Sequence, residues 1–210
     1  MSKLILGVGQ AHKLEQAFRR NDWTATEIDL LSQGDLLARI RQVVLGRAKI
    51  VPAGILKFLR KVAVGGTEKF IAADAFGANN PAGIKFFLGD NFKKFFLGKI
   101  EENVESATLN VHRLEKPSRN PEIMAELGAE KRVVKLAHFH GLIKAQANGQ
   151  EGPLLISGYA TVAYIEDDES GNLWAVCADW FSFNRGWFIG ADSVGDPGGW
   201  GMGVQVLSRK

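Results

Sequence analysis

The sequence has little cysteine, little tyrosine and no long apolar run. Its 210 residues include a single cysteine, Cys177, and only two tyrosines. A lone cysteine excludes an internal disulfide, so the fold must be held together by its hydrophobic core. No apolar run approaches the roughly 20 residues that a membrane-spanning helix needs, so we expect no membrane insertion.

The N-terminal stretch "MSKLILGVG" lacks the features of a secretory signal. Its apolar run is too short for the hydrophobic part of a signal peptide, and no small-residue cleavage site follows. We therefore expect a cytoplasmic protein, with display or export by another route left open. Gly7 and Gly9 begin a dinucleotide-binding pattern, but His12 stands where its third glycine belongs. We expect no cofactor.

The charge excess is small and partly gathered near the N-terminus. The formal net charge is +3, which indicates nucleic-acid binding only if the basic residues cluster. Those of the first fifty positions include Arg19, Arg20, Arg39, Arg41, Arg47 and Lys49. A helix-turn-helix that presents Arg39 and Arg41 to DNA is one interpretation. We favour a solvated helix face, because three small helices form with or without a DNA-binding role.

Residues 1–50 are predicted to form a small all-helical module. Leu14 and Phe18 lie four residues apart and therefore share one helix face. Thr24 and Glu27 have the spacing of a capping box, which marks the start of a second short helix.

The remainder of the chain divides into a connecting segment and a larger domain. Residues 51–83 hold repeated turn signals and are predicted to be a linker or connecting segment. Residues 84–210 then read as a strand, two helices and several strands, which indicates an α+β domain. The second of these helices is expected over 130–149. The strand within "ATLNVHRLE" should pair with the closing "VQVLS" and bring the domain's ends together.

No arrangement of residues with a catalytic or metal-binding spacing stands out. His138 and His140 alternate on one predicted helix, so they point about 200° apart and cannot jointly hold a metal. The acidic run at 166–169 lacks a calcium-loop pattern and is interpreted as a polar hairpin turn. We expect no enzyme; a hydrolase would need Cys177 or a serine beside one of those histidines.

The C-terminal stretch "NLWAVCADWFSFNRGWFIGADSVGDPGGWGMGVQVLSRK" resembles the end of a C-type lectin-fold domain. More narrowly, it resembles the variable proteins of diversity-generating retroelements, and much of the chain resembles an uncharacterised family from uncultured small-genome bacteria. The matching positions in the tail are Ala175, Val176, Trp180, Gly186, Trp187, Ala191, Ser193, Val194, Pro197, Trp200, Gly203, Val206, Ser208 and Arg209. Ile189 departs from the pattern, which has valine there. Calcium-dependent sugar binding is not implied, because the Glu-Pro-Asn and Trp-Asn-Asp signatures are missing.

The resemblance implies a surface that is rewritten genetically. In that family a reverse transcriptase alters adenines in a C-terminal segment, so AAC codons become any NNC codon. NNC codons cannot encode Lys, Glu, Gln, Met or Trp. The first four types make up 38 of the 210 residues, yet none occurs between 177 and 201, where composition predicts about four. A glycine-rich region is also poor in long charged side chains, which is the alternative explanation.

The resemblance implies a variable segment at about 177–204, with fixed tryptophans supporting it. The expected ligand-binding residues are Cys177, Asp179, Phe181, Ser182, Asn184, Arg185, Phe188, Gly190, Asp192, Gly198, Gly199, Gly201 and Met202. Met202 does not fit an NNC codon and is either scaffold or the product of another codon. The expected scaffold anchors are Trp174, Trp180, Trp187 and Trp200.

Strand alternation predicts how these two sets separate. Trp187, Ile189 and Ala191 should share one face of a strand. Phe188, Gly190 and Asp192 should share the opposite face. We therefore expect a C-type lectin-like domain, preceded by the helical module, that presents a hypervariable surface to a protein or other surface ligand. The alternative is a DNA-binding regulator, with residues 1–50 on DNA and a ligand-sensing C-terminal domain.

Overall fold

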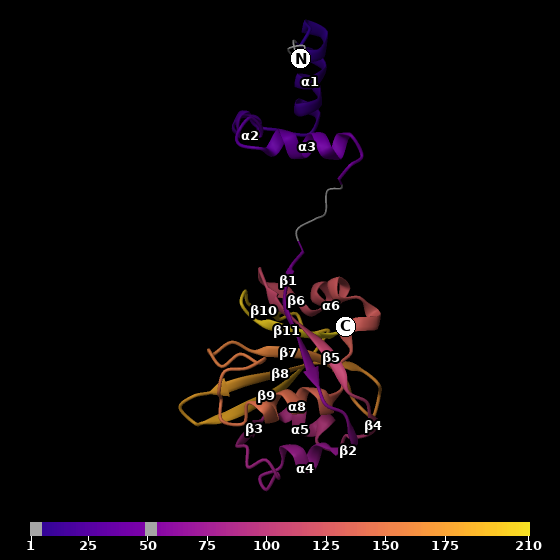
Figure 1. Ribbon diagram of the computed structural model, residues 1–210, viewed down its shortest axis with the longest axis vertical. Helices are drawn as coiled ribbons and strands as arrows, with labels where there is room; N and C mark the ends of the chain where they lie inside the picture. Colours follow the sequence, from indigo (N-terminus) through magenta and orange to yellow (C-terminus); the bar gives the residue numbers. More distant parts are fainter. Residues whose placement is uncertain (1–5, 49–53) are drawn as a thin grey trace. The chain divides into compact units, whose positions relative to one another are not determined.

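The computed structural model describes residues 6–48 and 54–210 (Figure 1). The chain forms two compact units, Met1–Ala53 and Gly54–Lys210. Helices and strands occur in comparable amounts, so the protein is of the α+β class.

The N-terminal unit contains three short helices within its described residues. They are α1 (Val8–Arg20), α2 (Ala25–Leu31) and α3 (Leu36–Val44). The predicted capping box is present, because the Thr24 backbone N–H donates to the Glu27 carboxylate at 2.7 Å and the Glu27 N–H donates to Thr24 Oγ1 at 3.3 Å. No residue between 6 and 48 is buried, so these helices do not enclose a core of their own.

The prediction of a connecting segment over 51–83 is wrong from residue 54 onward. Residues 54–83 belong to the larger unit, and they form β1 (Leu56–Val64), β2 (Thr67–Ile71) and α4 (Ala72–Phe76). Phe70 and Phe76 are buried in its main core. The turn signals of this stretch separate short elements within the domain, which therefore begins near Gly54 rather than at residue 84. Residues 51–53 lie outside the described residues.

A seven-stranded mixed sheet forms the centre of the larger unit. Its other strands are β3 (Phe86–Leu88), β5 (Ala107–Leu114), β7 (Thr161–Glu166), β8 (Leu173–Phe181), β9 (Gly186–Ser193) and β11 (Gln205–Arg209). The strand order is β1-β5-β11-β7-β8-β9-β3, and only the β11–β7 and β9–β3 pairs are parallel. The predicted pairing of the closing strand is confirmed, because β11 lies antiparallel to β5 with Val206 opposite His112.

Two small sheets complete the strand pairing. β4 (Ile100–Val104) pairs with β2, and β6 (Ser118–Arg119) pairs with β10 (Gly199–Trp200). The acidic run begins at Glu166, the last residue of β7, and its other three residues lie in the predicted turn between β7 and β8.

The helix expected over 130–149 is instead two helices, and this prediction is wrong in its extent. The remaining helices are α5 (Asp90–Phe96), α6 (Asn120–Leu127), α7 (Ala129–Arg132) and α8 (Leu136–Ala145). The chain leaves the helix at Val133, which forms a parallel bridge with Tyr164. A new helix then begins because the Glu101 carboxylate accepts hydrogen bonds from the first backbone N–H groups of α8, at 3.1 and 2.8 Å.

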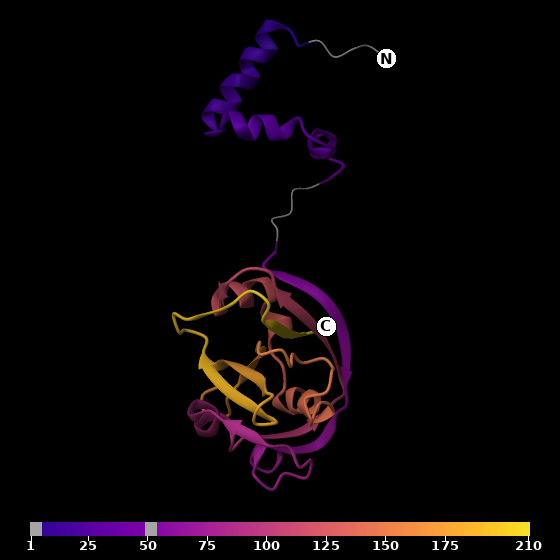
Figure 2. The same ribbon diagram turned by 90° about the vertical axis from the view of Figure 1, so that its left-hand side faces the viewer.

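The sheet carries a hydrophobic cluster on each face, because its central strands are apolar on both sides. The main cluster joins one face to α4, α5 and α8, and Figure 2 shows the sheet curving around α8. The second cluster lies on the opposite face, between the sheet, α6 and the segment that precedes β11. The β8–β9 hairpin contributes to both clusters, and this double role determines which of its side chains remain accessible.

Candidate ligand-binding surface

The β8–β9 hairpin separates the predicted anchors from most of the predicted variable residues. In the antiparallel register Trp180 lies opposite Trp187 and Asp179 lies opposite Phe188. Since residues opposite one another share a face, the tryptophans of β8 and β9 lie on the main-core face. The other face of the same two strands carries Cys177, Asp179, Phe181, Phe188, Gly190 and Asp192. We call this second face the outer face.

Trp187 is the most firmly held of the anchors. Its side chain is 0% exposed, and its Nε1–H donates to the Gln146 carbonyl oxygen at 3.1 Å. Trp180 packs edge-on against it with ring centroids 5.4 Å apart. Trp174 is half-buried and lies 4.3 Å, centroid to centroid, from the Phe95 ring of α5. These contacts fix the inner side of the hairpin independently of its outer side.

Trp200 lies elsewhere, in β10 against the second cluster. Its Nε1–H donates to Asn120 Oδ1 at 2.8 Å, and the same oxygen accepts the Tyr164 hydroxyl proton at 2.9 Å. Asn120 is buried, so its amide oxygen satisfies one indole donor and one phenol donor at the base of the C-terminal loop. The sequence gives no sign of this hydrogen-bonding role of Asn120, because its partners lie 44 and 80 residues away.

Three phenylalanine rings form a row across the outer face. Phe181 and Phe188 are stacked, with centroids 5.7 Å apart and planes 9° apart. Phe87, from the edge strand β3, lies opposite Phe188 and 6.1 Å from the Phe181 ring. The Lys85 ammonium lies over the Phe87 ring at 5.0 Å. Phe87 and Lys85 were not among the predicted site residues.

Two carboxylates of the outer face have no salt-bridge or hydrogen-bond partner within residues 6–48 and 54–210. Asp179 lies beside Phe188, and Asp192 lies further along β9. Partial burial raises the pKa of Asp179 above its ordinary value. Partial burial also raises the pKa of Asp192, and the negative charge of Asp196 adds to this effect.

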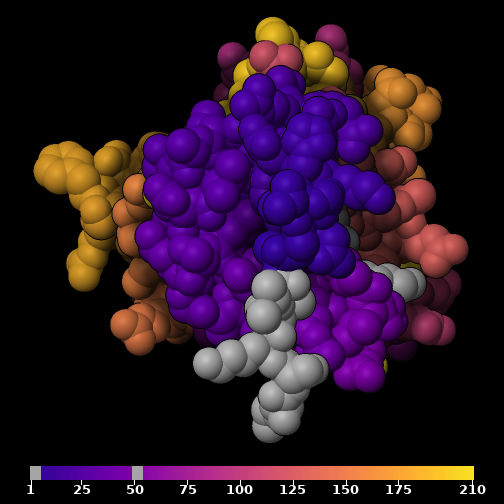
Figure 3. Space-filling view, turned by 90° about the horizontal axis from the view of Figure 1, so that it is seen from above, coloured from indigo at the N-terminus to yellow at the C-terminus, as the bar shows by residue number. Residues whose placement is uncertain are grey.

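The turn between β8 and β9 is fully accessible. Ser182, Asn184 and Arg185 are exposed, and the Phe183 side chain is 97% exposed. Arg185 adopts a left-handed backbone conformation with φ of 49°, which closes the turn. Figure 3 shows this turn, in gold at its left edge, projecting from the surface of the domain.

Two of the expected contact residues are not accessible, and the prediction that they form part of the binding surface is wrong. The Cys177 side chain is buried with 6% exposure, and burial raises the pKa of its thiol to about 12. Gly190 lies directly opposite Cys177 and is covered by the Phe188 ring. The outer face is not open along its whole length, because the second cluster covers the part of β8 that pairs with β7 and includes Cys177.

The remaining predicted positions lie in the loop that leads into β11. Gly198, Gly199 and Gly201 are exposed, and Met202 is 62% exposed. Gly199 pairs with Arg119, which fixes one point of this loop. Trp200 and Phe188 pack against the same second cluster, so loop and phenylalanine row lie on the same side of the sheet.

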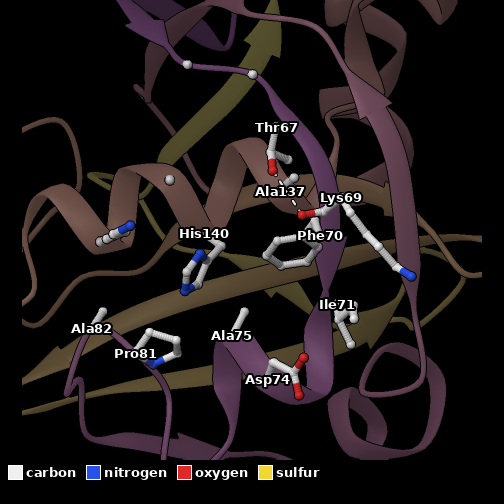
Figure 4. Close-up of a pocket in the computed structure, with 14 residues that line it drawn as sticks. Thr67, Lys69, Phe70, Ile71, Asp74, Ala75, Pro81, Ala82, Ala137 and His140 are labelled. Atoms are coloured by element: carbon white, nitrogen blue, oxygen red, sulfur yellow. Dashed lines mark hydrogen bonds between the residues drawn. The ribbon is translucent and has the colours of Figure 1, made fainter.

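The two helix histidines serve structural contacts. His138 Nε2 lies 2.8 Å from the Glu105 carbonyl oxygen. His140 packs among phenylalanine rings, and burial lowers its pKa to about 4. It lines a pocket of about 510 Å³, where Figure 4 shows its ring beside Phe70 and above Ala75. Cys177 belongs to the second cluster, whereas the rings that surround His140 belong to the main cluster on the other face of the sheet.

Within the described ranges, no three His, Cys, Asp or Glu side chains gather as metal ligands do. None of the helices in that part of the chain is long and apolar enough to cross a membrane. In the N-terminal unit, Arg19 pairs with Glu15 at 2.7 Å and Arg39 with Asp35 at 2.8 Å. These pairs give the DNA-binding hypothesis no specific support, and it stays a prediction.

No protein-family model matches the sequence, and no curated protein or solved structure is detectably similar to it. Its function must therefore be inferred from its own residues.

Proposed function

We propose that the chain is a receptor-like binding protein without catalytic activity, and that it presents a hypervariable surface diversified by a retroelement. The observation that carries this proposal is the separation of faces in the β8–β9 hairpin. Trp174, Trp180 and Trp187 lie on the main-core face, whereas the phenylalanines and aspartates lie on the other.

This separation is what a diversified surface requires. Side chains that change between variants must contribute little to the core, because most core substitutions destabilise a protein by several kcal/mol. Phe181, Asp192 and the turn residues 182–185 are exposed, so replacing them leaves the main cluster intact. Exposed phenylalanines supply large contact areas at low entropic cost, as aromatic residues do in antibody loops. The proposed partner is a protein or another surface ligand.

The assignment of the larger unit to the C-type lectin-like class is part of the proposal. The antiparallel pairing of β5 with the closing strand β11 supports it, since this pairing joins distant parts of the chain in one sheet. The domain contains no disulfide, since its single cysteine, Cys177, is unpaired. Two hydrophobic clusters stabilise the sheet instead.

The gene neighbourhood tests the origin of the surface. We expect a near-copy of the 3′ coding segment that differs from it only at adenines, beside a reverse-transcriptase gene. Absence of such a copy, together with sister sequences that do not vary at Asp179, Phe181, Phe188 and Asp192, contradicts the proposal.

A pair of libraries tests the physical requirement. One library randomises Phe181, Ser182 and Asn184 with NNC codons, and the matched control library randomises Trp180 and Trp187 in the same way. We expect most members of the first library to remain folded by resistance to proteolysis, and few members of the second. Similar survival in both libraries would show that the two faces do not differ.

A further inference from the structure

The residues of the outer face favour a partner with a positive charge. This inference rests on the proposed function and specifies the chemistry of the partner. We propose that the surface binds a protein segment that presents an arginine or lysine, whose alkyl stem lies along the Phe87–Phe181–Phe188 row and whose charge reaches Asp179. The juxtaposition of a phenylalanine row with unpaired carboxylates carries the proposal.

The position of Asp179 is the first step. Asp179 lies directly opposite Phe188 across the two strands, and Phe181 is two residues further along the same face of β8. Its carboxylate is therefore placed at the end of the aromatic row. An arginine or lysine side chain has this same pattern, an apolar stem followed by a charge.

The state of the Asp179 carboxylate is the second step. Asp179 is half-buried without a cationic partner among the described residues, which disfavours its charged form. A partner cation would compensate this cost when it arrives. An anionic or apolar partner would increase it.

The local charge is the third step. Residues 177–202 contain three aspartates and one arginine, Arg185, although the whole chain has a net charge of +3. With Lys85 beside the row, the candidate surface keeps an excess of one negative charge on a basic protein, which favours cationic partners.

The phenylalanine rings are the fourth step. The Lys85 ammonium already lies over the Phe87 ring at 5.0 Å, so a face of this row accepts a cation within the chain itself. Phe181, whose ring lies between those of Phe188 and Phe87, is 44% exposed and offers its ring to a second cation.

The test is a selection from a random twelve-residue peptide library displayed on phage, carried out on the full chain at low salt. We expect the frequency of Arg and Lys in the selected pool to rise about twofold over the starting library. For individual synthetic peptides from that pool, Asp179→Asn should weaken binding about tenfold, in the range of a desolvated charged contact.

Two further variants separate the possible outcomes. Asp29→Asn, on α2 of the N-terminal unit, changes the net charge equally and should leave peptide binding unchanged. Phe181→Ser should weaken the binding of the same peptides. Unfolding in urea checks that each variant is folded. The basic-partner proposal alone is overturned if binding depends on Phe181 but not on Asp179. It is also overturned if the selected peptides are not enriched in Arg and Lys. Binding that ignores Phe181 and Asp179 alike, or no enrichment at all, overturns the outer face as the binding surface as well.

Discussion

Replacing one aromatic residue on each face of the β8–β9 hairpin should have very different consequences for stability. Trp187→Ala removes a side chain that is 0% exposed and packed in the main cluster. Phe181→Ser removes a side chain that is 44% exposed on the outer face. The two residues lie within the same hairpin, so they share a local backbone environment.

The magnitudes follow from what each side chain touches. Truncation of a buried tryptophan costs about 3–5 kcal/mol of unfolding free energy, because it removes apolar contacts and leaves a cavity. The Gln146 carbonyl also loses the Trp187 Nε1–H donor, which adds about 1 kcal/mol. Phe181→Ser loses mainly its stacking on Phe188, worth about 0.5–1.5 kcal/mol. A domain of this size is stable by about 5–15 kcal/mol, so only the tryptophan variant comes close to unfolding.

Urea unfolding of the full chain, followed by far-ultraviolet circular dichroism, measures both effects. The midpoint should fall strongly for Trp187→Ala and slightly for Phe181→Ser, with similar slopes. Phe183→Ser is the matched control, since that ring is 97% exposed and should shift the midpoint little. If Phe181→Ser lowered the midpoint as much as Trp187→Ala, the division into a supporting and a replaceable face would be refuted.

Three other predictions address particular contacts. Cys177 should not react with Ellman's reagent at pH 8 in the native protein and should react fully in urea, because burial raises its pKa to about 12. His140 should make unfolding easier as the pH falls from 6.5 to about 4, because burial lowers its folded pKa and the unfolded chain takes up the proton first. His140→Phe should flatten that part of the stability profile, measured by urea unfolding at each pH. Asn120→Ala should leave the Tyr164 and Trp200 donors unpaired, lower stability by about 2–4 kcal/mol and speed hydrogen exchange in the loop around Trp200.

The strands that sequence alone predicted are those buried on at least one face. The alternation in β5, β9 and β11, and the apolar runs of β7 and β8, reflect packing against a core. β1 was not assigned to the domain because repeated turn signals dominate residues 51–83, and because the exposed Lys57, Arg60 and Lys61 are equally compatible with a short basic helix. β1 is an edge strand that is held by backbone pairing with β5. Backbone pairing does not require an alternation of apolar residues, so the sequence shows none that would reveal it.

The candidate site was predictable where it depends on one hairpin and not where it depends on topology. Alternation alone places Trp187 and Phe188 on opposite faces. Phe87 could not be predicted, because β3 has three residues and pairs with β9 across about one hundred positions of sequence. The burial of Cys177 was also hidden, since it results from the second cluster covering a face that β8 and β9 would otherwise expose.

That burial has a consequence for how freely the hairpin can change. Cys177 and Gly190 lie opposite one another, and a Cβ atom added at Gly190 would stand 3.0 Å from Cys177 Sγ and 3.0 Å from the Phe188 ring. These three positions therefore share one volume: a larger residue at 190 requires a smaller one at 177 or a displaced ring at 188. The exposed turn at 182–185 carries no such restriction. A surface that diversifies on this scaffold must vary independently at the turn and in compensating sets at the centre of the hairpin, because only the centre is shared with the core.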